Sequence, residues 1–343
     1  KSTAGTNVAC DALTNLASGG VLGGALIVLG EDFGEGSSIP QERSHAFAMK
    51  SQIWLLDPRP NHESIVKAVE DGFALSEASN TPVMLQVRIR ACHVTGEFVA
   101  KDNRKPAMTV REAVENPRRD VGRVVLPPAS YLHDREKLER RWPAAVKFIV
   151  ENGLNERFGP EQGDVGLVLQ GGMYNGVMRA LQHLGLGDVY GASALPLHVL
   201  NVTYPLCDEE IAAFCAGKRA VLMIEEGHPG YIEQNLVSIL HRKDIQTKVH
   251  GKDLLPMGGD YTDAVIESGL RRFLERHAHA LLGNRSAAPD ATPTLQHARV
   301  KALADVVPPR PAGFCTGCPE RPIFAAMKLT EKELGQHHVS GDI

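Results

Sequence analysis

Cysteine is sparse in this sequence, with six residues in 343. A disulfide scaffold would need many more, and scattered thiols are typical of a reducing compartment, so we expect a cytoplasmic protein. Long apolar runs are also missing: the longest, GGVLGGALIVLG at 19–30, is too short to span a bilayer and is interrupted by glycines. The formal net charge of −4 gives no electrostatic reason to bind nucleic acid or a lipid surface. We therefore expect a globular protein with neither a membrane nor a nucleic acid among its partners.

Compact apolar segments alternate with helical patterns along the first quarter of the chain. Between two of these segments a helix is expected to begin at Asn61 as its N-cap, with Ile65, Val69 and Phe73 on its apolar face. This order indicates βαβ crossovers and a mainly parallel sheet, hence an α/β fold. The expected strands are GALIVLG (24–30), IWLLD (53–57) and VMLQVRIR (83–90).

A second α/β unit is predicted after a charged segment without repeating strand signals, residues 101–160, which we interpret as a helical connector. Residues 283–310 are rich in Ala, Pro, Ser and Thr and are typical of an extended linker. The last part, 311–343, holds a cysteine turn, a helix near 322–335 and a short strand. In the second unit, strands are expected at 163–172, 197–204 and 220–227 and helices near 174–184, 208–216 and 229–242.

The pair Cys315 and Cys318 is the sharpest chemical signal, because a CxxC turn brings two sulfurs onto one metal or cluster with little loop entropy. One pair is only half of a zinc or iron–sulfur site, so further ligands must come from elsewhere. Two incidental turn cysteines, or a thioredoxin-type redox pair, remain alternatives. The thioredoxin alternative is weaker, because a Pro-rich linker rather than a strand precedes the motif.

A glycine-hinged loop follows the first strand and carries a dense set of polar side chains. It lies where α/β proteins present ligand-binding groups, so we interpret it as a candidate binding loop. Asp342 also follows an apolar strand, in VSGDI, and a carboxylate there can hold Mg²⁺ against a diphosphate. The polar side chains of the loop are Asp32, Ser37, Ser38, Gln41, Glu42, Arg43 and His45.

Other polar features have simpler interpretations. Glu225 and Glu226 follow a strand, and such a pair is expected to be solvated. Gly171 and Gly172 permit a tight strand-to-helix turn without binding phosphate, since neither GxGxxG spacing nor a Walker lysine is present. The histidines show no zinc spacing and are expected on the surface or in packing. The cysteines at 10, 92, 207 and 215 are expected to be buried small side chains.

Several motifs in order resemble the large (alpha) subunits of indolepyruvate ferredoxin oxidoreductases, which belong to the 2-oxo acid ferredoxin oxidoreductase family. The resemblance covers nearly the whole chain. The motifs are KSTAGTNVACDAL (1–13), GGALIVLGEDFGEGSSIPQERSHAFAM (23–49), NTPVMLQVRIRACH (80–93), CTGCPERP (315–322) and VSGDI (339–343).

The resemblance implies transketolase-like thiamine-binding domains with mainly parallel sheets, truncated at both ends. Residues 1–100 would be the later part of the pyrimidine-binding domain, and 161–282 a middle domain like the transketolase C-terminal domain. Residues 311–343 would begin the diphosphate-binding domain, after the connector and linker. Because half of each thiamine subsite would be missing, we expect the chain by itself to be inactive.

The same resemblance implies site residues and partners. Gly341 and Asp342 would begin the motif for thiamine diphosphate and Mg²⁺, and Cys315 and Cys318 would bind a [4Fe-4S] cluster. Ser37, Ser38, Gln41 and Arg43 would form a wall of the site, with Asn7 as a further contact. Glu320 stands where the family usually has histidine, which removes any role for that histidine.

The implied reaction converts an arylpyruvate and CoA into acyl-CoA and CO₂, with electrons passing through iron–sulfur clusters to ferredoxin. A small beta subunit of the same enzyme would be a partner. Two alternatives stay open: a cluster-free thiamine enzyme of the transketolase or decarboxylase type, and a noncatalytic subunit with a zinc-stabilised turn.

Overall fold

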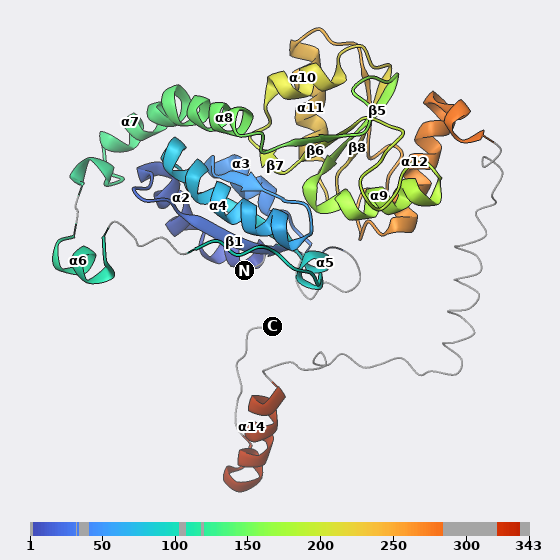
Figure 1. The fold of residues 1–343 in the computed structure, drawn as a ribbon. Coiled ribbons are helices and arrows are strands. Elements are labelled where there is room, and N and C mark those ends of the chain that lie inside the picture. Colours follow the sequence, from blue (N-terminus) through green and yellow to red (C-terminus); the bar gives the residue numbers. More distant parts are fainter. Residues whose placement is uncertain are drawn as a thin grey trace. The chain divides into compact units, whose positions relative to one another are not determined.

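The computed structural model describes residues 3–31, 33, 41–102, 108–117, 120–283 and 321–336. The chain divides into two units, Lys1–Gly283 and Asn284–Ile343. In the second unit the described element is helix α14 (Arg321–Leu334), close to the helix predicted at 322–335. Everything below concerns the first unit, in which two sheets lie near each other (Figure 1).

The first sheet has the strand order β1-β3-β2-β7, with three parallel strands and an antiparallel β7. Leu26 of β1 pairs with Val83 of β3, which also pairs with Trp54 of β2. Its elements are α1 (Thr3–Val8), α2 (Cys10–Gly19), β1 (Leu26–Glu31), α3 (Ser44–Ser51), β2 (Trp54–Leu56), α4 (His62–Ser79), β3 (Val83–Arg88), α5 (Ile89–Cys92) and β7 (Val202–Tyr204).

Helix α4 packs on β1 and β3, and α8 (Trp142–Glu151) packs on α4. The helix begins as predicted, because the Asn61 side chain accepts a hydrogen bond from the Ser64 N–H. Its predicted apolar face is correct only in part: Val69 is partly buried and packs against the core, whereas Phe73 is 44% exposed. The helix buries Leu75 together with small residues such as Ala68 and Gly72, and a Cβ at Gly72 would lie 2.7 Å from the Leu26 side chain. Close approach to the sheet therefore contributes to which face is turned inward.

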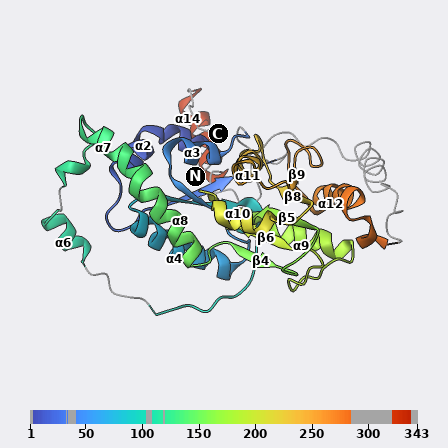
Figure 2. The ribbon, with the colours of Figure 1, turned by 90° about the horizontal axis from the view of Figure 1, so that it is seen from above.

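The second sheet has the order β4-β6-β5-β8-β9, parallel except for β4. One apolar cluster joins it to α9 and α12, and another joins it to α10 and α11, so helices cover both faces (Figures 1 and 2). Burial on both faces explains its continuous apolar strands. The elements are β4 (Glu156–Phe158), β5 (Val165–Gln170), α9 (Tyr174–His183), β6 (Leu197–Leu200), α10 (Asp208–Cys215), β8 (Ala220–Ile224), α11 (Tyr231–Arg242), β9 (Lys248–His250) and α12 (Asp263–His277).

The single strand predicted at 197–204 is two strands in different sheets. The chain leaves β6 at Asn201 and enters β7, which pairs with β2. Asn201 holds this crossing through its side chain and its backbone. The side-chain Nδ2 donates to the Leu154 carbonyl at 2.9 Å and to Glu156 at 2.8 Å. The backbone carbonyl oxygen of Asn201 accepts from the Asp57 N–H at 2.8 Å. The break is invisible in the apolar pattern because it depends on partners far away in sequence.

Two other predicted boundaries change. The strand expected at 83–90 ends at Arg88, and α5 begins at Ile89. The segment 101–160 contains α6 (Val110–Glu115), α7 (Ala129–Glu136) and α8, with a π-helical turn at Lys137–Arg141 that joins the last two (Figure 2). It also contains β4, a strand that the sequence pattern did not indicate. Across the described residues, no helix combines the length and apolarity needed to cross a bilayer.

Candidate functional site at the strand ends

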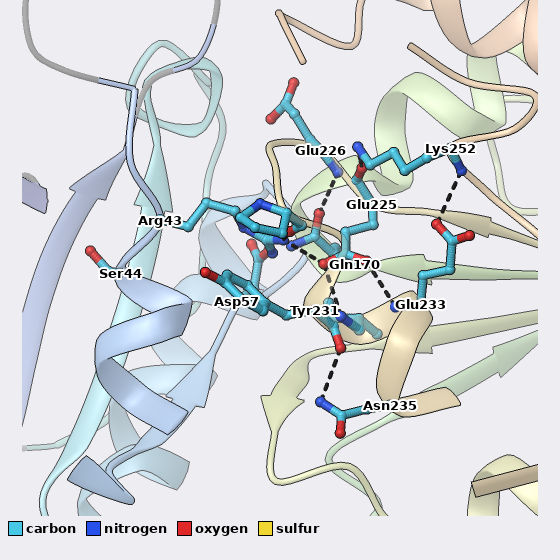
Figure 3. Close-up of polar contacts among 12 residues, drawn as sticks. Arg43, Ser44, Asp57, Gln170, Glu225, Glu226, Tyr231, Glu233, Asn235 and Lys252 are labelled. Carbon is cyan, nitrogen blue, oxygen red and sulfur yellow. Dashed lines mark hydrogen bonds and ion pairs between the residues drawn. The ribbon is translucent and has the colours of Figure 1, made fainter. Parts of the chain in front are cut away.

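Charged and amide side chains gather where the parallel strands of both sheets end. Glu31 ends β1, Arg88 ends β3 and Gln170 ends β5, while Asp57 directly follows β2 and Glu225–Glu226 directly follow β8. All of these side chains are buried. In open α/β sheets this edge is where ligands bind, so the two sheets bring their functional edges together. Figure 3 shows Asp57 on the side of the first sheet and Gln170, Glu225 and Glu226 on the side of the second.

Arg88 is the centre of this junction. Its Nη2 lies 2.7 Å from Asp57 Oδ2, and its Nη1 donates to Glu226 Oε2. Burial alone would lower the pKa of Arg88, but the Asp57 and Glu226 carboxylates outweigh burial and raise it, so the guanidinium stays charged. Glu226 is fixed further, because its Oε1 accepts from the Tyr261 N–H and its own N–H donates to Gln170. The junction is thus an ion network closed by backbone donors.

Glycines allow the strand ends to approach this closely. A Cβ at Gly171 would overlap the backbone oxygen of Asp57, and one at Gly172 would overlap Arg88 and the Asp57 carboxylate. The prediction that glycines permit the turn between β5 and α9 is therefore confirmed. A further reason why the turn requires glycine is its contact with the first sheet.

Arg43 fastens the end of the candidate binding loop to the second sheet. Its Nη1 lies 2.5 Å from Glu225 Oε1 and 2.5 Å from the Pro229 carbonyl oxygen. The guanidinium also lies over the Tyr231 ring, 5.2 Å from the centroid. Glu225 in turn accepts from the Ile232 and Glu233 N–H groups at the start of α11. The Arg43 side chain is buried in these contacts (Figure 3).

The start of α3 lies beside this contact. The Ser44 N–H donates to Glu31, whose pKa burial raises, although the Ser44 hydrogen bonds and the Arg88 and Arg43 charges act in the opposite direction. Both ring nitrogens of His45 are buried without a hydrogen-bond partner. His45 stacks on Tyr231 at 5.5 Å, and burial lowers its pKa well below 6.5, with Arg43 adding to the effect. The imidazole is therefore neutral at pH 7.

Lys252 closes the network on the side of the second sheet. Its Nζ donates to the Glu225 carbonyl at 2.5 Å and to the Tyr261 hydroxyl at 2.8 Å. Burial lowers the pKa of Lys252 to about 8, while the Glu225 charge opposes this and Arg43 adds to it. The amine is therefore mostly protonated at pH 7 and available as a donor.

The structure brings some of the predicted site residues together. Asn7 of α1 donates from Nδ2 to Glu42 Oε2 at 2.8 Å, which joins the N-terminal helix to the loop. Gln41 is exposed next to this pair, whereas Arg43 is buried in the junction. Within the described ranges no group of three or more His, Cys, Asp or Glu side chains could hold a metal ion. The predicted residues Ser37, Ser38, Cys315, Cys318, Gly341 and Asp342 lie outside the described residues.

The expectation that Glu225 and Glu226 are solvated is wrong, since they are 1% and 2% exposed. A signal was available: two carboxylates directly after a wholly apolar parallel strand lie at the ligand-binding edge. The expectation for the cysteines is correct for Cys207 and Cys215 but wrong for Cys92, which is exposed, while Cys10 is partly buried.

Comparison with known proteins supports the family resemblance. No family model matches the chain. Curated indolepyruvate oxidoreductase subunits IorA match nearly all of it: the Methanothermobacter marburgensis protein is 26% identical over 334 residues, and the Thermococcus kodakarensis protein 28% over 332. The chain is a distant relative of the IorA subunits. These alignments cover 96% and 94% of the chain, but it spans only about half the length of the relatives, 49% and 47%.

The Archaeoglobus fulgidus IorA subunit matches in the same way, with 26% identity over 99% of the chain and 50% of the relative. Among solved structures, the 2-oxoglutarate:ferredoxin oxidoreductase from Magnetococcus marinus superposes with a TM-score of 0.51, covering 79% of the chain and 52% of that protein at 16% identity. This second likeness concerns the fold alone. With the sheets described above, it confirms the predicted α/β class with mainly parallel, transketolase-like architecture for this IorA-like chain.

Proposed function

We propose that the chain is part of a thiamine diphosphate-dependent 2-oxo acid:ferredoxin oxidoreductase that acts on an arylpyruvate such as indolepyruvate. The observation that carries this proposal is the similarity to IorA subunits across 94–99% of the chain. The proposed reaction converts the 2-oxo acid and CoA into acyl-CoA, CO₂ and a proton, while two one-electron ferredoxins are reduced. A companion subunit, ferredoxin, CoA and the 2-oxo acid are the proposed partners.

The described residues fit a polar cofactor at the strand-end edge. Both ring nitrogens of His45 lack a hydrogen-bond partner there, and a polar group bound at this edge would satisfy one of them. When bound, thiamine diphosphate would supply the carbanion that adds to the 2-oxo acid and the electron sink for the decarboxylation. The protein's part is to hold, orient and shield that group.

The residues of this chain divide that work. Asn7 and Gln41 would line the wall beside the cofactor, together with Ser37 and Ser38 of the same loop. Arg43 acts through Glu225 and holds the end of the loop in one place, so it is a positioning residue. Arg88 keeps the two strand-end edges in register by pairing with Asp57 and Glu226. Rigid placement of this kind lowers the entropy cost of orienting a substrate.

The remaining groups would come from the last part of the chain. Gly341 and Asp342 would contribute to the diphosphate and Mg²⁺ subsite, since carboxylate oxygen is a ligand that Mg²⁺ prefers. Cys315 and Cys318 would supply two of the four thiolates of a [4Fe-4S] cluster. Such a cluster next to the cofactor would remove electrons one at a time.

The test is an anaerobic assay of the enzyme complex that contains this chain. We expect reduction of a viologen dye that depends on indolepyruvate, thiamine diphosphate and CoA together, with a higher kcat/KM for indolepyruvate than for pyruvate. Reduction with pyruvate but not with arylpyruvates would refute the substrate assignment. No reduction with any 2-oxo acid in the presence of all cofactors would refute the proposed function.

A further inference from the structure

A thiol and an amine lie in direct contact between helices α2 and α3. Lys50, in the last turn of α3, donates from Nζ to the sulfur of Cys10, the first residue of α2, at 3.1 Å. Cys10 is partly buried and Lys50 is exposed, so small solutes can reach the pair. The proposed function uses neither residue, and the pair therefore requires an explanation of its own.

Further contacts keep the two groups within reach of each other. The Lys50 ammonium also lies over the Phe47 ring, 5.2 Å from its centroid. The hydroxyls of Thr14 and Ser51 approach to 3.5 Å and join the same two helices independently of the thiol. Within the described ranges, the amine of Lys50 is thus directed to a sulfur atom and an aromatic ring rather than to a carboxylate.

The other cysteines that the structure describes lack this combination. Cys207 and Cys215 are buried, and burial raises the pKa of both thiols to about 12, so they are poor nucleophiles at pH 7. Cys92 is exposed, but no lysine amine contacts its sulfur in the described part of the chain. Solvent access and an adjacent amine are combined at Cys10.

This combination suits a two-step reaction with hydrogen peroxide. First, the Cys10 sulfur attacks one peroxide oxygen: the S–O bond forms, the O–O bond breaks, water leaves with the thiol proton, and a sulfenic acid results. Second, the Lys50 nitrogen, after it has lost a proton to solvent, attacks that sulfur. The N–S bond forms and the hydroxyl leaves as water. One thiol, one ammonium and one peroxide thus give a sulfenamide, two waters and a proton, with sulfur oxidised by two electrons and peroxide reduced by two.

We propose that Cys10 and Lys50 form a modification site, at which a peroxide creates a reversible sulfenamide crosslink between α2 and α3. The inference goes beyond the proposed function and does not rest on it. The crosslink consumes the sulfenic acid before a second peroxide can convert it into the irreversible sulfinic acid. Two thiol molecules reverse it: the first attacks the Cys10 sulfur and releases the amine, and the second resolves the mixed disulfide. The lysine therefore protects the cysteine during oxidation.

Peptide mapping of the 343-residue chain tests the proposal after treatment with a small excess of hydrogen peroxide. Trypsin cuts after Arg43 and so separates Cys10 from Lys50 unless the two are linked. We expect the two peptides to stay joined, with a mass about 2 Da below their sum, and to separate after addition of dithiothreitol. A joined pair about 14 Da above the sum would have an oxygen atom between nitrogen and sulfur, and would overturn the direct bond.

Lys50→Arg is the matched variant, because it keeps the positive charge and the trypsin site, whereas a guanidinium stays protonated and does not attack sulfur. It should give no joined peptide, and its Cys10 should gain about 32 or 48 Da at least about threefold faster than in the unmodified chain. Cys92→Ser should leave the joined peptide unchanged. Both substitutions are at exposed positions, so an unchanged thermal unfolding curve identifies a folded protein. Absence of the joined peptide from the oxidised unmodified chain would overturn the proposal.

Discussion

Arg43 and Glu225 lie 182 positions apart in the sequence, yet their side chains meet at 2.5 Å with almost no solvent exposure. The contact ties the end of the loop after β1 to the start of α11, and hence the first sheet to the second. Removal of one partner from a buried pair of this kind strongly destabilises the folded protein, because the other charge stays buried without compensation. Three of the predictions below concern buried groups of this junction and its sheets.

Replacement of Arg43 by Met should lower the free energy of unfolding by about 3–5 kcal/mol at pH 7, since the Glu225 carboxylate would remain buried without its cation. Urea unfolding followed by circular dichroism measures the change. Arg135→Met is the matched control, because Arg135 pairs with Glu139 on the surface of the same unit, and it should cost less than about 1 kcal/mol. A loss below about 1 kcal/mol in the Arg43 variant would contradict a structural role for the pair.

The turn after β5 should not tolerate a side chain. Gly171→Ala would force its Cβ against the backbone oxygen of Asp57, which cannot rotate away, and should destabilise the protein by about 1–3 kcal/mol or prevent folding. Gly30→Ala in β1 is the comparison, because a Cβ there meets nothing within 4 Å and should be neutral or slightly stabilising. Equal melting temperatures for the two variants would show that the sheets do not approach as described.

Stability should fall as the pH drops below 6.5, in part because of His198. Its pKa is lowered to about 3, by burial first and by the Arg157 charge second. Between those pH values the unfolded chain binds a proton that the folded protein does not, so this contribution to stability is present above pH 6.5 and is lost as the pH falls. Each such histidine contributes a slope of about 1.4 kcal/mol per pH unit.

The variant His198→Phe preserves the stacking position on Phe214 and removes the titration. Its loss of stability between pH 7 and pH 5 should therefore be about 2 kcal/mol smaller than that of the unmodified chain. The same substitution at His241, which is exposed on α11, is the control for exchanging an imidazole for a phenyl ring. Parallel curves for His198→Phe and the unmodified chain would argue against a neutral buried imidazole.

The cysteine turn distinguishes three alternatives for the whole enzyme. If Cys315 and Cys318 bind an iron–sulfur cluster, their joint replacement by Ser should lower the iron content of the anaerobically purified complex and abolish 2-oxo acid-dependent dye reduction. Cys92→Ser, at an exposed thiol, should do neither. Activity that survives the double replacement would favour a cluster-free thiamine enzyme, and about one zinc without iron would favour a zinc-stabilised subunit.

Local pattern was sufficient to predict most elements, because apolar strands and amphipathic helices follow directly from residue order. Asn61 as a cap and the helices α9, α10 and α11 close to their predicted positions are examples. Such features depend on neighbours within a few positions, and the sequence contains that information.

The errors concern contacts between distant segments. From the local sequence Glu225 and Glu226 look like a solvated pair. In the folded protein they are buried and pair with Arg43 and Arg88, which belong to the side of the first sheet. Phe73 looks like a core residue until the close approach at Gly72 is known. The candidate site itself was only partly predictable. Its loop was recognised from composition, but the buried Glu225 carboxylate that anchors Arg43 at the end of the loop lies 182 positions further along the chain.

Asn201 has a mechanical consequence. One residue separates strands that belong to different sheets, and the buried pairs Arg43–Glu225 and Arg88–Glu226 join the same two layers. Rotation of one sheet against the other would therefore have to separate buried charges, which is energetically costly.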